Sequence, residues 1–512
     1  MSVHTRRERT SHLTIAGPLT VSTKNPRYFA VDADVPEQER AVFLTGSHIW
    51  NNLQDGMGPG PECSANAEVF DYDAYLAFLK ERGHNFIRLW RWEQFKSLAA
   101  GGAFHLCMAP QPWARTGPGF ATDGKAKFDL ERLDNEYFDR LRDRVVAAGN
   151  AGFYVGVMLF DGWALHLSPS PHNVEGHPFH ADNNINSVAI TSVKDYMATP
   201  LDAQVRAIQE AYIRQVVDTL HDLPNVLWEV ANEAPGGGSV DQSFAGMLGL
   251  VDVPDWGDST DWQYWVIDVV KDHEKRQGYV THPIGMTMQF PVVDEIRVND
   301  PLYQSRAEWI SPGYDDERFK GGGHPMAPGA SPSRWYDNPP AGDGRKVVIS
   351  DTDHFAPGKG DELWAWKSFL RGHHTILMDF GLIGGVNPAD KRADSPGVPS
   401  FASFEPVRHA MGDTRRYAER VHLIDMTPRA ELGSTGYVLA NPGQEYLVLQ
   451  PDEHGEPFKV ELPAGTYSVE WYDIASRETT AGDAVRLEKD ARITFTAPFA
   501  QRGPSVLLLQ RT

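Results

Sequence analysis

Residues 226–235, Val-Leu-Trp-Glu-Val-Ala-Asn-Glu-Ala-Pro, form a short apolar run that ends in a polar pair. Such a run is typical of a strand that is covered on both faces, as in a parallel sheet. The same pattern of an apolar run followed by charged, amide or aromatic residues recurs along the chain from Ala41 to about Phe380. The predicted strands are 42–45, 86–90, 154–160, 226–230, 284–289, 309–311, 347–350 and 375–379.

Amphipathic segments lie between several of these strands. Apolar residues recur at helical spacing in the segments 72–79, 137–145, 205–220, 262–269 and 363–370. Gly83, Gly149 and Gly278 follow three of these segments, and we expect them to end the helices. Strands interleaved with helices in this way predict an α/β fold, a (β/α)8 TIM barrel. An open doubly wound sheet is the alternative, although no Gly-x-Gly-x-x-Gly follows the first strand.

The regions on either side of the predicted barrel have a different sequence pattern. Residues 1–40 are predicted to form an N-terminal extension with short strands at 13–15, 19–21 and 28–31, and the catalytic barrel is predicted to span 41–424. Short apolar runs separated by turns such as Asn441-Pro442-Gly443 predict a β-sandwich at 425–512. Long segments predicted as loops after barrel strands are 56–66, 100–124, 165–193, 234–258 and 313–335.

The composition excludes several classes of partner. The 48 Lys and Arg against 69 Asp and Glu give a formal net charge of −21. A surface this acidic repels phosphate backbones and anionic lipids. We therefore expect no nucleic-acid partner and no membrane partner. We also find no apolar run of membrane-spanning length, no secretory signal and only Cys63 and Cys107. We therefore expect a cytoplasmic protein, and whether it forms a homo-oligomer stays open.

A TIM barrel carries its reactive side chains at the C-terminal ends of its strands. Glu233 follows Asn232 at the end of the fourth strand, and Asp351 and Asp353 follow the seventh strand. These two strands lie on opposite sides of the barrel mouth, so their carboxyl groups face one another. Cleavage of a glycosidic bond needs such a pair, one acid for the leaving oxygen and one nucleophile or base. The predicted catalytic residues are therefore Glu233 with Asp351 or Asp353.

Other strand ends carry side chains suited to binding a sugar. Tryptophans can stack on sugar faces, and arginine and asparagine can form hydrogen bonds with hydroxyl groups. The predicted substrate-binding residues are Arg88, Asn232, His48, Trp50, Asn52, Trp90, Trp92, Asp161, Trp163, His166 and His354. Arg88 could instead be a structural ion-pair residue, and His354 could instead hold one of the aspartates. Glu93 and Asp161 are lower-ranked alternative acids, and Glu229 would need a partner if it is buried.

The segment 165–180 is rich in histidine. His166, His172, His177 and His180 match neither a helical His-x-x-x-His pair nor a zinc-finger pattern, and prolines interrupt the segment. We therefore expect a loop with no metal, and we expect the chain to use no cofactor.

Two motifs resemble those of known glycosidases. Asn232-Glu233 after an apolar strand resembles the acid/base motif of the retaining clan-A glycoside hydrolases. The opening Tyr28-Phe29, with 43–48 and Asn51-Asn52, resembles the apiosidase-like glycoside hydrolases, which have a small C-terminal β-domain. The resemblance implies a retaining mechanism and favours a pentofuranoside. It also implies a nucleophile at Asp351, where the family usually has glutamate; since aspartate is one methylene shorter, Asp353 remains the alternative.

The resulting prediction is an exo-acting retaining glycoside hydrolase that cleaves a small glycoside or oligosaccharide. Two other functions remain open. One is a non-catalytic carbohydrate-binding protein with a degenerate barrel. The other is a metal-dependent amidohydrolase on the same barrel, although Ser47-His48-Ile49-Trp50 lacks the His-x-His signature at the first strand.

Overall fold

The structure is a computed structural model. It describes residues 15–35, 37–59, 69–99, 104–166, 173–237, 257–290, 292, 297–315, 333–382, 386 and 400–512. Its centre is a closed barrel of parallel strands, which confirms the TIM-barrel prediction. In barrel order the strands are β4 (Thr45–His48), β6 (Phe86–Leu89), β11 (Tyr154–Asp161), β12 (Val226–Asn232), β13 (Ile284–Thr287), β14 (Trp309–Ser311), β15 (Val347–Asp351) and β16 (His374–Met378).

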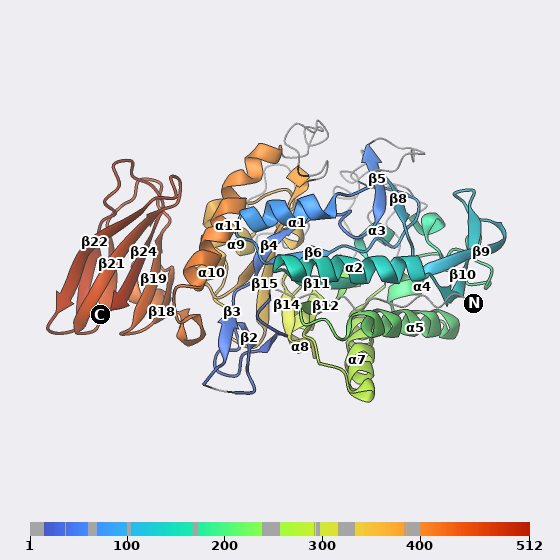
Figure 1. Cartoon of the computed structure of the whole chain (residues 1–512), viewed down its shortest axis with the longest axis horizontal. Helices are drawn as coiled ribbons and strands as arrows, with labels where there is room; N and C mark the ends of the chain where they lie inside the picture. Colours follow the sequence, from blue (N-terminus) through green and yellow to red (C-terminus); the bar gives the residue numbers. More distant parts are fainter. Residues whose placement is uncertain are drawn as a thin grey trace, which may run out of the picture.

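Helices cover the outside of the barrel (Figure 1). The longer ones are α1 (Tyr72–Glu81), α2 (Asn135–Ala151), α5 (Ala203–Leu220), α7 (Thr260–Gln277), α10 (Glu362–Leu370) and α11 (Glu405–Ala418). Asp71, Asp134, Asp202 and Asp361 accept hydrogen bonds from backbone N–H groups in the first turns of α1, α2, α5 and α10. Gly278 ends α7 as predicted. The prediction for α2 was wrong by one turn, because Gly149 lies within the helix and Gly152, with φ 96°, ends it.

Shorter helices lie in the connecting segments. The α-helical ones are α3 (Trp163–His166), α4 (Lys194–Met197), α8 (Asp300–Gln304) and α9 (Arg334–Asp337). The 3-10 helices are η2 (Asn173–Gly176), η4 (Thr352–His354), η5 (Phe380–Leu382), η7 (Phe401–Phe404), η8 (Leu423–Asp425) and η9 (Ala430–Leu432).

A small antiparallel sheet packs against the N-terminal end of the barrel. It contains β1 (Thr20–Val21), β2 (Phe29–Val31) and β3 (Arg40–Val42). Phe29 and Val31 share an apolar cluster with barrel residues such as Phe86 and Leu227. The predicted strand at 42–45 was wrong in its bounds, because Val42 ends β3 and Thr45 begins β4. Both halves of this run are apolar, so the pattern does not reveal the break. Most of the strand predicted at 13–15 lies outside the described residues.

Two insertions near the barrel mouth form strands where we predicted loops. One is a sheet of β5 (Asp55–Pro59), β7 (Ser97–Ala99) and β8 (Phe104–Ala109), and the other is a hairpin of β9 (Trp113–Phe120) and β10 (Ala126–Leu133). The loop predictions at 56–66 and 100–124 were therefore wrong in part. Gly117-Pro118-Gly119 favours a turn in the sequence, but pairing of β9 with β10 and the ion pair of Arg115 with Asp123 support the hairpin.

The C-terminal region is a β-sandwich, as predicted. Its larger sheet has the order β17 (Thr427–Pro428), β18 (Val438–Asn441), β19 (Glu445–Gln450), β24 (Ser505–Arg511), β21 (Gly465–Asp473) and β22 (Thr479–Leu487). The smaller sheet pairs β20 (Phe458–Leu462) with β23 (Ala491–Phe495). Tyr446 of the larger sheet and Phe458 of the smaller one belong to a shared apolar cluster.

The other face of the larger C-terminal sheet packs against the barrel. In Figure 1, α10 and α11 lie between this sheet and the barrel strands. Trp366 of α10 and Tyr417 of α11 contact the ring of Tyr472 on β21, with centroid distances of 5.6 and 5.5 Å. The central strand β19 and most of its neighbour β24 are thus buried on both faces. The exact domain boundaries at 40 and 424 stay predictions.

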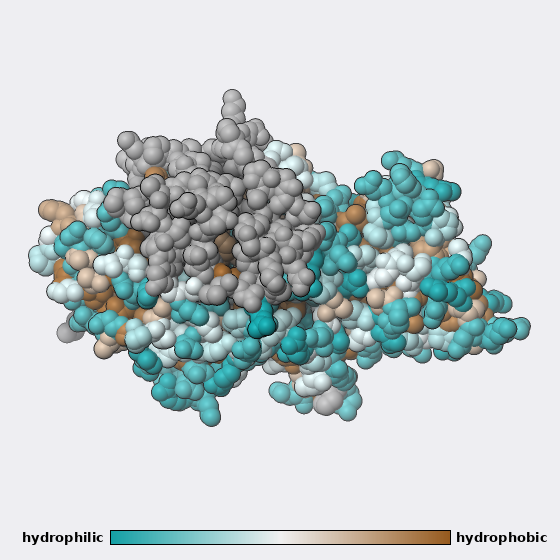
Figure 2. Space-filling model, turned by 180° about the vertical axis from the view of Figure 1, so that it is seen from behind, coloured by the Kyte–Doolittle hydropathy of each residue, from teal (hydrophilic) through white to brown (hydrophobic). Residues whose placement is uncertain are grey.

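The surface of the described residues is largely hydrophilic on the face seen in Figure 2, over both the barrel and the C-terminal sandwich. Apolar residues are scattered between the hydrophilic ones. Within the described part of the chain, no helix combines the length and the apolar character needed to cross a bilayer.

Candidate active site

Arg88 of β6 lies at the centre of a buried ionic network at the barrel mouth. Its Nε donates a hydrogen bond to Glu229 at 2.7 Å, and its Nη2 donates to Asn232 Oδ1 at 2.7 Å. Its Nη1 lies 3.4 Å from an Asp351 oxygen and 3.2 Å from an Asp353 oxygen. The side chain is only 3% exposed, so these carboxylates and the amide compensate a cation that is removed from water. Arg88 therefore connects the ends of β6, β12 and β15.

Glu233 follows β12 and has an unusual backbone conformation. Its φ of 41° lies in the left-handed region, which costs a non-glycine residue about 1–3 kcal/mol and is concentrated at functional sites. Burial raises the pKa of Glu233 well above its usual range, and the nearby charge of Asp353 raises it further. This shift favours the protonated form of Glu233, which is the form that a general acid needs.

Asp351, the last residue of β15, is held tightly in its ionised form. Its Oδ1 accepts a hydrogen bond from the backbone N–H of Asp353 at 3.0 Å and lies 3.1 Å from His48 Nε2. Its Oδ2 accepts from Arg88. Burial raises its pKa, but His48 and Arg88 outweigh burial and hold the pKa below the usual range. Both oxygens of Asp351 are therefore engaged by donors.

Asp353 has a different environment although it lies two residues further along the chain. Its side chain is 11% exposed, compared with 2% for Asp351. Burial and the charge of Asp351 raise the pKa of Asp353 to about 6, while Arg88 opposes this rise. Asp353 is also the neighbouring charge with the largest effect on the pKa of Glu233. The strongest carboxyl–carboxyl coupling of Glu233 is thus with Asp353.

His354 holds Asn232. His354 Nδ1 lies 2.7 Å from Ser311 Oγ at the end of β14, and His354 Nε2 lies 3.3 Å from Asn232 Oδ1. Burial lowers the pKa of His354 to about 3, so the ring is neutral. Its hydrogen-bond partners are Ser311 and Asn232.

Predicted tryptophans form an aromatic cluster beside this network. The ring of Trp50 lies 5.8 Å from the rings of both Trp92 and Trp163. Trp90 stacks on His48 at 5.7 Å with an interplanar angle of 11°. Trp163 is half-buried, whereas Trp50, Trp90 and Trp92 are buried. Trp163 is thus the most exposed aromatic ring of the four.

Other predicted residues support this arrangement. Asn52 joins two backbone groups of the β6 region, because its Nδ2 donates to the carbonyl of Arg88 at 2.7 Å and its Oδ1 accepts from the N–H of Trp90 at 2.8 Å. Asp161 ends β11 and contacts Asn232. Glu93 is buried among Arg91, His177 and Tyr196. The side chain of His166 lies outside the described part of the structure.

Asp351, Asp353 and His354 have donor atoms that lie within 4.8 Å of one another, close enough to share a metal ion. However, Arg88 already contacts both carboxylates, and both nitrogens of His354 have protein partners. These residues fit an arginine-centred anion network better than a metal site. In the histidine-rich segment, His177 contacts Glu93, and His180 contacts Asp182 at 3.9 Å.

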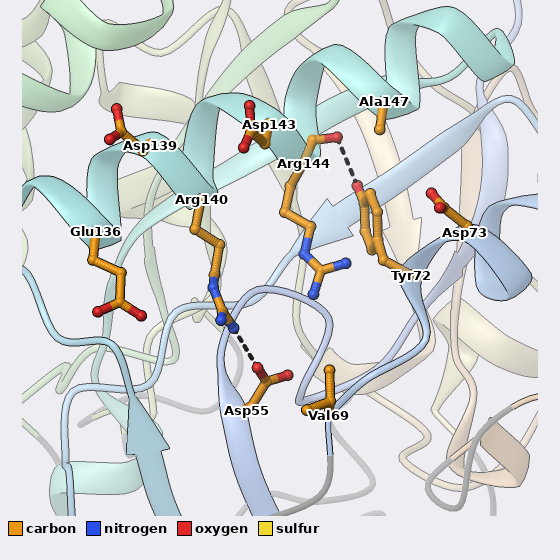
Figure 3. A pocket seen from close by; sticks show the side chains of 10 residues that line it. All are labelled: Asp55, Val69, Tyr72, Asp73, Glu136, Asp139, Arg140, Asp143, Arg144 and Ala147. Carbon is orange, nitrogen blue, oxygen red and sulfur yellow. Dashed lines mark hydrogen bonds and ion pairs between the residues drawn. The ribbon is translucent and has the colours of Figure 1, made fainter.

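A separate pocket lies on the flank of the barrel, between α1 and α2 (Figure 3). It has a volume of about 680 Å³ and is lined by residues of these helices and β5 rather than by barrel strand ends. Arg140 pairs with Asp55 across it, and the Arg144 guanidinium lies 4.3 Å from the centroid of the Tyr72 ring. Its charged groups are therefore partly matched by one another, and we do not assign the active site to it.

Sequence reasoning missed two contributors to the site. Glu229 is the principal partner of Arg88, and Ser311 orients His354. A signal for the first was available: Arg88 and Glu229 are opposite charges within apolar strands, and each needs a partner if it is buried. For Ser311 the only signal was its place at the end of a predicted strand.

Comparisons with known proteins agree with this architecture. No protein-family model matches the chain, and no curated protein matches it. Solved structures do: one described as a glycoside hydrolase has 13% sequence identity and a TM-score of 0.57, with 97% of each chain covered. A glycoside hydrolase family 5 protein from Bacteroides vulgatus has 13% identity and a TM-score of 0.58, with 97% of this chain and 93% of that chain covered. The chain thus shares its fold with these glycoside hydrolases over nearly its whole length.

Proposed function

We propose that this protein is an exo-acting retaining glycoside hydrolase. The observation that carries the proposal is the coupling of Glu233, a buried acid with a raised pKa at the end of β12, to Asp353 beyond the end of β15. An acid that keeps its proton and a carboxylate that can ionise, located at different strand ends of one barrel mouth, are what glycosidic bond cleavage requires. The fold shared with structures described as glycoside hydrolases supports the same function.

In this proposal Glu233 is the acid/base and Asp353 is the nucleophile. Asp353 attacks the anomeric carbon while Glu233 gives its proton to the leaving oxygen, and the glycosyl ester is then hydrolysed by water that Glu233 deprotonates. A nucleophile needs a free lone pair and access to substrate. Asp353 meets this need better than Asp351, since Asp351 is more buried and both its oxygens are engaged. Asp351 would then hold Arg88 and the backbone of Asp353 in position.

The substrate that we propose is a small glycoside or oligosaccharide. Trp163, the half-buried member of the aromatic cluster, is suited to stacking on a sugar face, and Asn232 is suited to binding a hydroxyl group. The long segments after the barrel strands favour an enclosed pocket and hence exo action. The resemblance to apiosidase-like enzymes favours a pentofuranoside. The sequence predicts that Arg88 faces the substrate. In this proposal Arg88 acts instead through the carboxylates that it holds, because its guanidinium is already bonded to Glu229, Asn232, Asp351 and Asp353.

The other functions considered have less support. In an amidohydrolase the first-strand histidine would bind metal, whereas His48 Nε2 contacts Asp351. A non-catalytic sugar-binding protein would have no need for a strained, protonated Glu233 coupled to a second carboxyl group. The predicted cytoplasmic location has one observation against it, because Cys107 forms a disulfide bond, and disulfides persist mainly in oxidising compartments.

The function is tested with a panel of aryl pyranosides and furanosides. We expect the wild-type protein to hydrolyse at least one of them, and proton NMR to show that the first-formed sugar retains the anomeric configuration of the substrate. Glu233→Gln should lower kcat/KM by about 10²–10⁴-fold for a poor leaving group, since general acid catalysis contributes about that factor. The loss should be smaller for a dinitrophenyl leaving group, which departs without a proton.

Glu229→Gln is an unsuitable control because Glu229 is paired with Arg88, so we use Glu461→Gln on the C-terminal sandwich, an exposed residue. Saturable sugar binding without turnover on the whole panel would reject the hydrolase and favour the binding protein. Release of the inverted anomer would reject retention.

A further inference from the structure

We propose that Asp161 is a positioning residue that fixes the side-chain amide of Asn232, so that Asn232 presents its remaining N–H to a hydroxyl group of the substrate. This inference rests on the proposed function and assigns a role in substrate specificity to a residue of the same site. It goes beyond the general role of a sugar contact that the sequence suggested for Asp161.

The first observation is the hydrogen bond between Asp161 and Asn232. Asp161 and Asn232 are register partners at the ends of the adjacent strands β11 and β12. Asn232 Nδ2 donates a hydrogen bond to Asp161 Oδ1 at 3.2 Å, and the same oxygen accepts from the backbone N–H of Trp163 at 3.2 Å. Both Asp161 and Asn232 are buried. Asp161 Oδ1 therefore acts as an acceptor with two donors in fixed positions.

The other end of the amide is fixed as well. Asn232 Oδ1 accepts a hydrogen bond from Arg88 Nη2 at 2.7 Å and lies 3.3 Å from His354 Nε2. An amide flip would bring the NH2 group against the arginine donor and the carbonyl oxygen against Asp161, so the flip is unfavourable at both ends. One Nδ2 hydrogen is used by Asp161, and the other makes no hydrogen bond among the described residues. That second hydrogen is the free donor at the end of β12, next to Glu233.

The surroundings of Asp161 favour its neutral form. Its Oδ2 is buried and has no hydrogen-bond partner among the described residues. The charged groups around it are Glu93 and Arg88 from the β6 region, Glu233 after β12, and Asp353 in η4. Arg88, the cation among them, is already shared by Glu229, Asp351 and Asp353. Burial accordingly raises the pKa of Asp161 well above its usual range, with Glu93 and Asp353 raising it further against the effects of Asn232 and Arg88.

Two variants distinguish the positioning role of a neutral Asp161 from the effect of a charged Asp161 and from a purely structural role. Asp161→Leu removes the acceptor and frees the Asn232 amide, so kcat/KM should fall about 100-fold, the scale of a small misplacement in an active site. Asp161→Asn is close in shape to the neutral acid and keeps an acceptor oxygen, so it should recover most of that loss. The basic limb of its pH profile should coincide with that of the wild type, because no charge near Glu233 has changed.

A basic limb that moves to lower pH in Asp161→Asn would overturn the proposal, since it would mean that a negative Asp161 had been raising the pKa of Glu233. Equal losses in the two variants would also overturn it. Deoxy analogues of the substrate give a further check: for the analogue that lacks the hydroxyl bound by Asn232, the difference between wild type and Asp161→Leu should disappear.

A measurement without turnover keeps the proposal independent of the hydrolase assignment. In infrared spectra of protein labelled with ¹³C in the aspartate carboxyl groups, the wild type at pH 8 should show a protonated-carboxyl band that Asp161→Asn lacks. Absence of this difference would overturn the neutral state of Asp161. If the wild type hydrolyses no glycoside yet shows the band, the proposed function fails while the protonation state of Asp161 stands.

Discussion

Asp351 and Asp353 are separated by a single residue, yet their pKa values are shifted in opposite directions. The pKa of Asp351 lies below the usual range because His48 and Arg88 outweigh its burial. The pKa of Asp353 rises to about 6 because burial and the negative Asp351 outweigh Arg88. In the proposed mechanism Asp351 is therefore a fixed anion, and Asp353 is the carboxylate that attacks the substrate.

These pKa shifts predict a bell-shaped dependence of kcat/KM on pH. Asp353 must be ionised to attack, so activity should fall as the pH drops below about 6. Glu233 must be protonated, so activity should also fall as the pH rises through its raised pKa. Asp351→Asn removes the anion that raises the pKa of Asp353, and the acidic limb of its residual activity should move to lower pH. An acidic limb that stays in place or moves to higher pH would contradict this account.

The candidate catalytic pair could be predicted from the sequence only in part. Glu233 was identifiable because it follows Asn232 at the end of an apolar strand, and strand ends carry the chemistry of a barrel. The choice between Asp351 and Asp353 was not, because it depends on His48 and Arg88, which lie more than 250 positions away in sequence. The exposure of the two side chains could not be predicted from the sequence either.

At the scale of elements, the turn after β11 supports the turn after β12. The N–H of Gly162 donates a hydrogen bond to the carbonyl of Asn232 at 2.8 Å. A Cβ at this position would lie 2.6 Å from Ala234 Cα and 2.8 Å from the carbonyl oxygen of Glu233. Glycine therefore allows the two backbones to approach closely, directly beside the peptide group that follows Glu233.

We predict that Gly162→Ala lowers kcat/KM by about 100-fold, because the added methyl group must displace the backbone that carries Glu233. The free energy of unfolding should fall by about 1–3 kcal/mol, the usual cost of overpacking. Gly503→Ala is the matched control, since a Cβ there would meet nothing within 4 Å. Kinetics and chemical denaturation of both variants test this prediction, and full activity of Gly162→Ala would contradict it.

The elements that could be predicted are those in which the local sequence pattern agrees with the tertiary packing. The barrel strands are apolar because helices and core cover them, and α5 and α7 present clear apolar stripes. The hairpin β9–β10 was missed because its outer half is exposed and rich in glycine. The boundary between β3 and β4 was missed because Phe43 and Leu44, which connect the two strands, continue the apolar run of Val42.

Across the whole molecule, the C-terminal sandwich is joined to the barrel by polar contacts as well as by the aromatic packing on α10 and α11. The hydroxyl group of Tyr472 on β21 donates a hydrogen bond to Asp413 of α11 at 2.6 Å, and Arg477 donates to the same carboxylate at 2.8 Å. Tyr417 and Arg420 bind Glu470 in the same interface. We infer that barrel and sandwich unfold as one cooperative unit.

Tyr472→Phe should lower the free energy of unfolding by about 1–3 kcal/mol, because it leaves the buried Asp413 with one donor fewer. Calorimetry should record a single transition at a lower Tm. Tyr446→Phe is a comparison variant, since its hydroxyl group accepts a hydrogen bond from Gly443 within the sandwich itself. If the two parts were independent, calorimetry would resolve two transitions and Tyr446→Phe would shift only one of them.

The central claim is that Glu233 and Asp353 act together on an acetal carbon. It is tested most directly by trapping the covalent intermediate with a 2-deoxy-2-fluoro aryl glycoside of the sugar that the panel selects, followed by peptide mass spectrometry. The account predicts one fluoroglycosyl group per chain, attached as an ester to Asp353, with no label in Asp353→Asn. A label on Asp351, or no label in a wild-type enzyme that releases the inverted anomer, would contradict it.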